Sequence, residues 1–139
     1  MSGRGLVSVG ELVGRVLLGL LFVLEAGMKL ASYADAARYT AAYGVPAQLL
    51  PAAIALELVA GTMIIAGWGT RIAALALSAF CFVVALIFHT KFSDQNQLIH
   101  FQKDIALAGA FLVVWARGGG VLSVDAWRAR RGGSAASEI

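Results

Sequence analysis

Cysteine and charge are both scarce in this sequence. The chain of 139 residues has a single cysteine, Cys81, so it can form no disulfide within itself and has no Cys-x-x-Cys pair. Charged residues make up 14% of the chain, against roughly 25% in an average soluble domain. The first absence excludes a disulfide-stapled domain and a self-contained dithiol site, and the second argues against a soluble protein.

Apolar residues take the place of the missing charge. They make up 60% of the chain, and the mean hydropathy is +0.81. A soluble domain of this size buries only about two thirds of the surface that its unfolded chain exposes, so it could not hide so much apolar surface from water. We therefore predict that the lipid bilayer is the main partner. The net charge of +3 does not indicate nucleic-acid binding, because the basic tail has no recognition motif.

Four segments are predicted to cross the membrane as helices, since each crossing needs about 20 mainly apolar residues. The fourth is the weakest, because only Ile105 to Ala116 is continuously apolar and the span must also include the polar stretch from His100 to Asp104. Three spans and a re-entrant or core segment are the alternative, but the other helices could shelter the polar start of a fourth span. The predicted spans cover about residues 7–31, 47–68, 70–90 and 98–117.

The predicted fold class is therefore all-α, a four-helix transmembrane bundle with up-and-down topology and short loops. Residues 1–131 form its single domain, residues 32–45 and 91–97 are its longer loops, and residues 132–139 are expected to be disordered. Four spans put both termini on one side of the membrane. That side carries six arginines against four basic residues on the other, so the positive-inside rule places both termini in the cytoplasm.

Ionisable side chains inside the spans are costly and usually face the bundle interior, which makes them the most informative residues of the sequence. In the first span, Glu11, Arg15, Glu25 and Lys29 fall on one face at about 100° per residue. Glu11 and Arg15 are four positions apart, as are Glu25 and Lys29, so each pair is predicted to meet on the helix surface. The pattern Gly10-x-x-x-Gly14 predicts close packing of this span against another helix.

Glu57 lies about 15 Å along the second span, near the middle of the bilayer. No cation stands within four positions of it in the sequence, so its partner must come from another helix, or the carboxyl must be neutral. Two interpretations remain open. Glu57 either makes an interhelical hydrogen bond or ion pair that fixes the packing, or it exchanges protons.

Further ionisable groups gather at the outer ends of the spans. His89 ends the third span, His100, Lys103 and Asp104 begin the fourth, and Lys29 approaches the same level from the first. A metal site is disfavoured because the eleven-residue spacing of the two histidines matches no compact ligand motif. Cys81 is interpreted mainly as a small apolar core residue. The candidate site residues are Glu25, Lys29, Glu57, His89, His100, Lys103 and Asp104, with Arg15 and Cys81 as secondary candidates.

The order and spacing of several short motifs resemble the DoxX family of small bacterial membrane proteins. The matching features are Arg15…Phe22…Gly27-x-Lys29, the loop Gly44-Val45-Pro46, Glu57 followed by Gly61 and Gly67, the run HFQKDIALAGAFLVV, and the exit GGGVLSVD. The resemblance extends from about Gly10 to Asp125. It implies a four-helix membrane bundle in the bacterial inner membrane and a link to quinone or thiol redox systems. This sequence departs from the family pattern at Lys103-Asp104, where many relatives have Lys-Asn, with a neutral asparagine in place of the aspartate.

Three functions remain open at this point. The resemblance favours an accessory subunit of a quinone- or thiol-linked membrane redox system. The alternatives are a small proton-coupled transporter or binder of an apolar molecule, which predicts a cavity reaching Glu57, and an assembly partner of a larger membrane complex. The sequence has no self-sufficient catalytic motif, so enzyme activity is left open. No cofactor is evident, although a quinone would fit the first function, and the partners considered are lipid, other membrane or redox proteins, and a second copy of the chain.

Overall fold

The computed structural model describes residues 3–136, and it describes the side chains of residues 3–132. Four of its helical segments are long and apolar enough to cross a membrane, which confirms the predicted all-α, four-span fold. These four segments are Gly3–Ala31, Ala47–Ala66, Thr70–Phe88 and Gln95–Arg117. In chain order the elements are α1 (Gly3–Ala31), α2 (Tyr33–Ala42), the 3-10 turn η1 (Ala47–Leu49), α3 (Leu50–Ala66), α4 (Thr70–Phe88), α5 (Gln95–Arg117) and α6 (Val124–Ala136).

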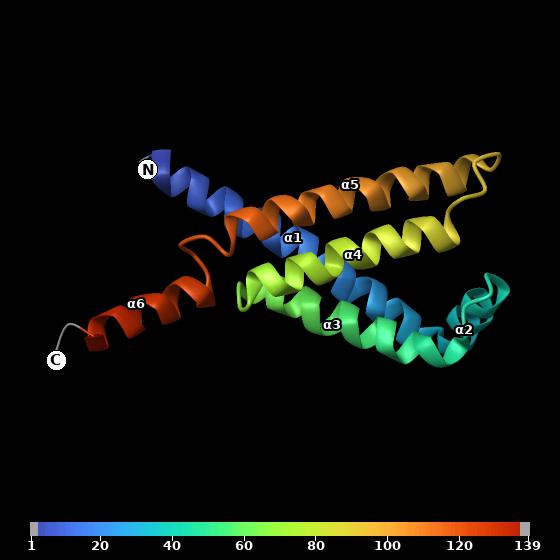
Figure 1. Cartoon of the computed structure of the whole chain (residues 1–139), viewed down its shortest axis with the longest axis horizontal. Helices are drawn as coiled ribbons and strands as arrows, with labels where there is room; N and C mark the ends of the chain where they lie inside the picture. Colours follow the sequence, from blue (N-terminus) through green and yellow to red (C-terminus); the bar gives the residue numbers. More distant parts are fainter. Residues whose placement is uncertain (1–2, 137–139) are drawn as a thin grey trace.

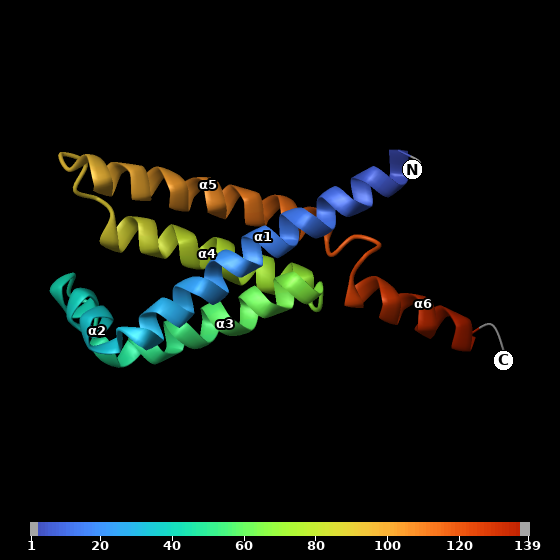
Figure 2. The same cartoon turned by 180° about the vertical axis from the view of Figure 1, so that it is seen from behind.

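The four long helices form two pairs. Helix α1 packs along α3, and α4 packs along α5. The pairs lie together at the end that holds both termini and the α3–α4 turn, and they spread apart toward α2 and the α4–α5 loop (Figures 1 and 2). We call the first end, with Arg15, residues 67–70 and residues 117–125, the closed end. The other end, with α2 and residues 89–94, is the cavity end.

A tight glycine turn joins the two pairs at the closed end. Gly67 and Gly69 have φ angles of 70° and 55°, a left-handed conformation that costs glycine nothing and other residues 1–2 kcal/mol or so. Gly67 ends α3, and its N–H donates to the carbonyls of Met63 and Ile64. This turn makes α3 and α4 antiparallel neighbours, as predicted.

Two glycines set the close contact between α1 and α3. A Cβ added to Gly19 would lie 2.5 Å from the carbonyl oxygen of Gly61, so the two backbones nearly touch there. The prediction of close packing at Gly10 and Gly14 is wrong, because a Cβ at either position meets nothing within 4 Å. Helix α1 has 29 residues, or roughly 43 Å at 1.5 Å per residue. Its first turns therefore extend past the C-terminal end of α3, and both glycines fall in that projecting part.

Arg15 is almost fully buried at the closed end, where it is 3% exposed. Its Nη1 donates to the carbonyl oxygens of Ile64 and Ile65 at 2.7 and 3.2 Å, and its Nη2 donates to that of Leu122 at 2.6 Å. The last carbonyls of a helix have no partner within the helix, so the end of α3 offers a guanidinium ready acceptors. Arg15 thereby joins α1, α3 and the segment that leads to α6.

The predicted Glu11–Arg15 pair is therefore wrong. Arg15 turns inward to the carbonyls of α3, while Glu11, one turn earlier, meets the end of α5. The Arg117 Nη2 atom lies 2.5 Å from Glu11 Oε1, and the predicted neighbour is replaced by a partner 106 residues away. The second predicted pair is confirmed, since Lys29 Nζ lies 3.5 Å from Glu25 Oε2.

Asp125, in the first turn of α6, caps the start of α4. Its Oδ1 accepts from the Gly69 N–H at 2.8 Å, and its Oδ2 accepts from the N–H and the hydroxyl of Thr70 at 3.0 and 2.8 Å. Burial alone would raise the pKa of Asp125, but the hydrogen bonds from Thr70 and Gly69 outweigh it and hold the pKa below its ordinary value. The carboxylate thus stays charged where the first N–H groups of α4 need an acceptor.

Two segments are more ordered than the sequence indicated. Residues 32–45, expected as a loop, contain the helix α2, because Ala36 and Ala37 pack on a small core of Ala26, Leu50 and Ile54. Residues 132–139 were expected to be disordered, but α6 continues to Ala136. Once Asp125 and the cap of its first turn fix the start of α6, each further residue adds a hydrogen bond at small entropic cost. Residues 137–139 lie outside the described part of the chain.

Candidate functional site

A large cavity lies between the two helix pairs at the cavity end. Its volume is about 1380 Å³, and its walls come from α1, α2, α3, α4 and α5. Most of the lining is apolar, including Leu21, Phe22, Phe80, Val84 and Ile87. The cavity lies where the two pairs spread apart, at the end opposite the glycine turn that joins α3 to α4 (Figure 1).

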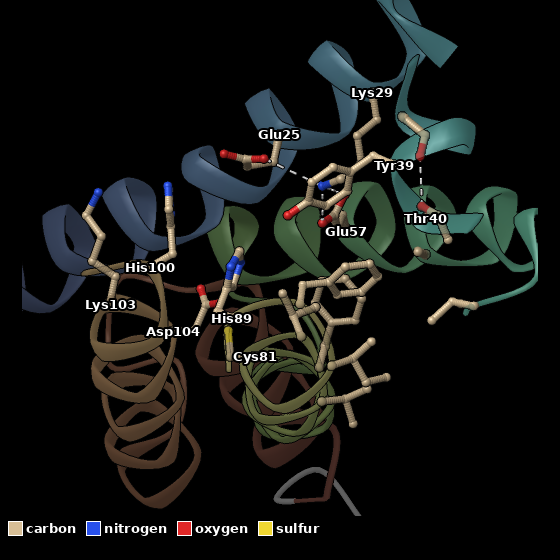
Figure 3. Close-up of a pocket in the computed structure, with 18 of the residues that line it drawn as sticks. Glu25, Lys29, Tyr39, Thr40, Glu57, Cys81, His89, His100, Lys103 and Asp104 are labelled. Atoms are coloured by element: carbon tan, nitrogen blue, oxygen red, sulfur yellow. Dashed lines mark hydrogen bonds and ion pairs between the residues drawn. The ribbon is translucent and has the colours of Figure 1, made fainter. Parts of the chain in front are cut away.

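The candidate residues meet in this cavity. All seven main candidates line it, as does Cys81, although they come from four different helices (Figure 3). Arg15 is the exception, since its guanidinium donates hydrogen bonds to backbone carbonyls at the closed end. The structure thus brings the seven main candidates and the secondary candidate Cys81 to one cavity, and it places the other secondary candidate, Arg15, away from it.

Lys29 and Glu57 form an ion pair between α1 and α3. The Lys29 Nζ donates to both carboxylate oxygens of Glu57, at 2.7 and 2.9 Å, and lies near Glu25 as well. Glu57 is only 2% exposed, whereas the Lys29 and Glu25 side chains are 28% and 44% exposed. The prediction that Glu57 finds its partner on another helix is confirmed. Removing Lys29 would leave the Glu57 charge buried alone, which is strongly unfavourable, whereas Lys29 would keep Glu25 as a neighbour if Glu57 were removed.

A second cluster lies on the opposite wall, on α4 and α5. The Nδ1 atom of His89 lies 2.8 Å from the carbonyl oxygen of the Gln97 side chain, and its Nε2 lies 3.7 Å from Asp104 Oδ2. The His89 and His100 rings stack, with centroids 5.1 Å apart and planes 23° from parallel. His100 and Lys103 are exposed, and both point from α5 toward α1 (Figure 3).

An aromatic cluster joins the two helix pairs across the cavity end. Tyr39 of α2 stacks on Phe88 of α4 with centroids 5.7 Å apart, and Tyr43 packs against both rings at 4.9 and 5.2 Å. The sequence reasoning missed these residues and Gln97. A signal was present, because Tyr33, Ala36, Ala37 and Thr40 follow the i, i+3, i+4, i+7 spacing of an amphipathic helix in the supposed loop.

Cys81 is 2% exposed and belongs to the apolar core as well as to the cavity floor. As a lone thiol it cannot run a dithiol cycle without a partner. Among the residues that the structure describes, no group of three histidine, cysteine or carboxylate side chains is arranged to hold a metal ion. The chemistry of the cavity therefore rests on its ion pair, its histidines and its carboxylates.

Fold and site together define a small helical membrane protein with a ligand-sized cavity between two helix pairs. Residues 10–90 match the model of the DoxX family, and the chain belongs to that family. It is 36% identical over 122 residues to "Inner membrane protein YqjF" of Escherichia coli (strain K12), covering 88% of this chain and 94% of that protein. It is 30% identical over 121 residues to "Inner membrane protein YphA" of the same organism, covering 82% and 86%. No solved structure matches the chain.

Proposed function

We propose that this protein binds an amphiphilic molecule in the cavity and serves as an accessory subunit of a membrane redox system, with a quinone as the bound molecule. The cavity carries this proposal. Ligand sites are typically apolar hollows with a few convergent polar groups, of roughly 300–1,000 Å³ for a drug-sized ligand. A cavity of about 1380 Å³ has room for a polar head and part of an apolar tail.

The residues on the cavity wall fit a quinone. A quinone head has carbonyl oxygens that accept hydrogen bonds, and Lys29, Lys103 and His100 are donors that face the cavity. The apolar lining suits its tail. When bound, a quinone supplies reversible two-electron, two-proton chemistry. The residues of this chain would bind the head, orient it between the two walls and keep its tail out of water.

The same geometry favours a quinone link over a thiol link. Cys81 is a single, almost fully buried thiol, so thiol exchange would need both a partner thiol and an opening in the floor of the cavity. A quinone would need neither a partner thiol nor such an opening, because the polar groups that would bind it already face the cavity.

We also propose that the protein resides in the inner membrane with its closed end in the cytoplasm. Both curated relatives are named inner membrane proteins. The start of α1, the α3–α4 turn and α6 lie at the closed end (Figure 1), and the positive-inside rule favours the cytoplasm for the arginines there. A cysteine-accessibility measurement in spheroplasts, with Cys81→Ser and a new cysteine at Ser2 or at Asn96, tests this orientation. Labelling of the Ser2 variant from outside would contradict it.

Equilibrium binding of a radiolabelled short-chain quinone to the purified protein in lipid nanodiscs tests the ligand. Leu107→Trp fills the cavity from α5 and should weaken binding at least about tenfold, or 1.4 kcal/mol. Ile72→Trp is the matched control, because Ile72 is 76% exposed at the closed end and should leave binding unchanged. Equal retention by the parent, Leu107→Trp and empty nanodiscs would remove the quinone proposal.

One observation also supports the second candidate, a proton-coupled transporter or binder of an apolar molecule. The cavity reaches Glu57, as that hypothesis requires. Reconstituted vesicles with an imposed proton gradient distinguish the two. Gradient-driven accumulation of the amphiphile inside the vesicles would favour transport, and binding without accumulation would favour the accessory role.

A further inference from the structure

We propose that His89 and Asp104 form the proton-binding pair of the cavity, and that Glu57 is a fixed anion. This inference does not depend on which molecule the cavity binds. It begins from one unsatisfied atom. The Oδ2 atom of Asp104 is buried and has no hydrogen-bond partner, although the carboxyl side chain faces the cavity.

The orientation of the His89 ring explains why this oxygen matters. Gln97 presents its carbonyl oxygen to Nδ1 at 2.8 Å, so Nδ1 carries a hydrogen and donates it. In the neutral ring the other nitrogen, Nε2, then has only a lone pair. That lone pair faces Asp104 Oδ2 at 3.7 Å, so two acceptors oppose each other with no hydrogen between them.

One proton resolves this opposition. Bound to Nε2, it makes an imidazolium that faces a carboxylate, and bound to Oδ2, it makes a carboxylic acid that faces a basic nitrogen. In either position the pair holds a single proton at a site open to the cavity. The side chains of His89 and Asp104 are 14% and 20% exposed, so the proton can exchange with water in the cavity.

Gln97 connects this pair to α2. Its side-chain N–H donates to the Tyr43 hydroxyl at 3.3 Å, and Tyr43 belongs to the aromatic cluster that joins the two helix pairs. The hydrogen bond from His89 to Gln97 therefore fixes the ring tautomer through a set of contacts that reaches α2. The other charged and titratable groups that line the cavity are Glu25 and Lys29 of α1, Asp35 and Tyr39 of α2, Glu57 of α3, Cys81 of α4, Asp94 before α5, and His100 and Lys103 of α5.

Glu57 differs from His89 and Asp104 in its hydrogen bonds and in its exposure. Both of its oxygens accept hydrogen bonds from Lys29, and its side chain is 2% exposed. A cation in direct contact with both oxygens favours the charged carboxylate, because protonation would give up that ionic contact. The proton-exchange role that the sequence suggested for Glu57 thus moves to Asp104 and His89.

The chain has two histidines, which makes a direct test practical. His100→Asn leaves His89 as the sole imidazole, and ¹⁵N-histidine NMR of this variant in lipid nanodiscs reports the two ring nitrogens separately. We expect the neutral ring to carry its hydrogen on Nδ1, and the second hydrogen of the imidazolium to sit on Nε2 when the sample is acidified. Asp104→Asn removes the carboxylate that faces Nε2, so it should lower the fraction of doubly protonated ring at a given acidic pH, whereas Glu57→Gln should leave that fraction unchanged.

Two further variants keep the test decisive if Asp104→Asn folds poorly. Asp104→Glu keeps a carboxylate and should retain the parent behaviour, and Gln97→Leu should produce a mixture of Nδ1–H and Nε2–H tautomers. A neutral ring with its hydrogen on Nε2 would overturn the proposal, as would an equal effect of Glu57→Gln and Asp104→Asn. The measurement uses ligand-free protein, so loss of quinone binding in the separate experiment leaves it unaffected.

Discussion

The two ends of the bundle use the same kinds of charged residue in opposite ways. At the closed end, Arg15 and Asp125 bind backbone groups, the carbonyls that end α3 and the N–H groups that begin α4. At the cavity end, Lys29, His89 and Asp104 contact other side chains and face an open volume. Backbone groups cannot move away from their partners, whereas side chains can exchange partners for a ligand, water or a proton.

This difference indicates where rigidity and function lie. The closed end joins α1, α3, α4, α5 and the start of α6 through a few charge-assisted hydrogen bonds, which are about twice as strong as neutral ones. Among the side chains that the structure describes, each end leaves one buried atom without a hydrogen-bond partner, Arg15 Nε at the closed end and Asp104 Oδ2 at the cavity end. Asp104 faces an open cavity, whereas the Arg15 side chain is held by three backbone carbonyls. Changes at the closed end should therefore alter stability, and changes at the cavity end should alter binding.

Arg15→Met should have the largest effect, because it leaves the carbonyls of Ile64, Ile65 and Leu122 without their donor. Each buried group that loses its partner costs about 1–3 kcal/mol, so we expect a loss of about 3 kcal/mol or more. Reversible unfolding in mixed micelles, followed by tryptophan fluorescence, measures it. Arg4→Met, at an exposed position near the start of α1, should change little. Equal stability of both variants would contradict the anchoring role of Arg15.

Gly19→Ala should destabilise the bundle by about 1–3 kcal/mol, since the added methyl group meets the Gly61 carbonyl oxygen. The two helix backbones would have to move apart to make room for it. The same unfolding assay applies. Gly10→Ala is the matched control on the same helix, where the methyl group enters open space, and it should be neutral or stabilising by up to 1 kcal/mol or so. If both changes act alike, the α1–α3 contact lies elsewhere.

Asp125→Asn should cost about 1 kcal/mol near neutral pH, because the amide replaces an acceptor oxygen that caps α4. The pKa of Asp125 is lowered in the folded protein, so its contribution is present above the ordinary aspartate pKa of about 3.9. That contribution is lost as the pH falls through the lowered value. The stability gap between parent and variant should therefore close in acid, and Asp35→Asn, at an exposed pair, should show no such gap.

The smallest effect on stability is expected at the cavity end. Replacing both partners of the buried ion pair, Lys29→Met with Glu57→Met, should change stability by less than about 1 kcal/mol, because apolar replacement of a buried pair is often neutral. Lys29→Met alone should cost more, since it leaves the Glu57 charge buried without its partner. Quinone binding to the double variant should fall even though its unfolding curve matches the parent. A large loss of stability in the double variant would show that the cavity end, too, holds the fold together.

Part of the site was accessible from the sequence because ionisable residues are rare in membrane spans. Glu25, Lys29 and Glu57 stand out in apolar helices, and the need to neutralise Glu57 predicted a partner on another helix. The partner itself could not be predicted, because two helices offered cations at the same level. Gln97 and Tyr43 gave no such signal, since a glutamine and a tyrosine near a helix end are ordinary residues.

The sequence by itself determined the four spans, the antiparallel turn at Gly67 and Gly69, and the gathering of charged groups toward one end. These follow from apolar length, glycine conformation and the cost of burying charge, all of which act locally. Three features were decided only by the tertiary structure. Glu11 forms its ion pair with Arg117 and not with Arg15, residues 33–42 form a helix, and the two helix pairs spread apart around a cavity. Each of these depends on which surfaces meet across the bundle, as does the close contact of Gly19 with Gly61, which joins residues 42 positions apart in the chain.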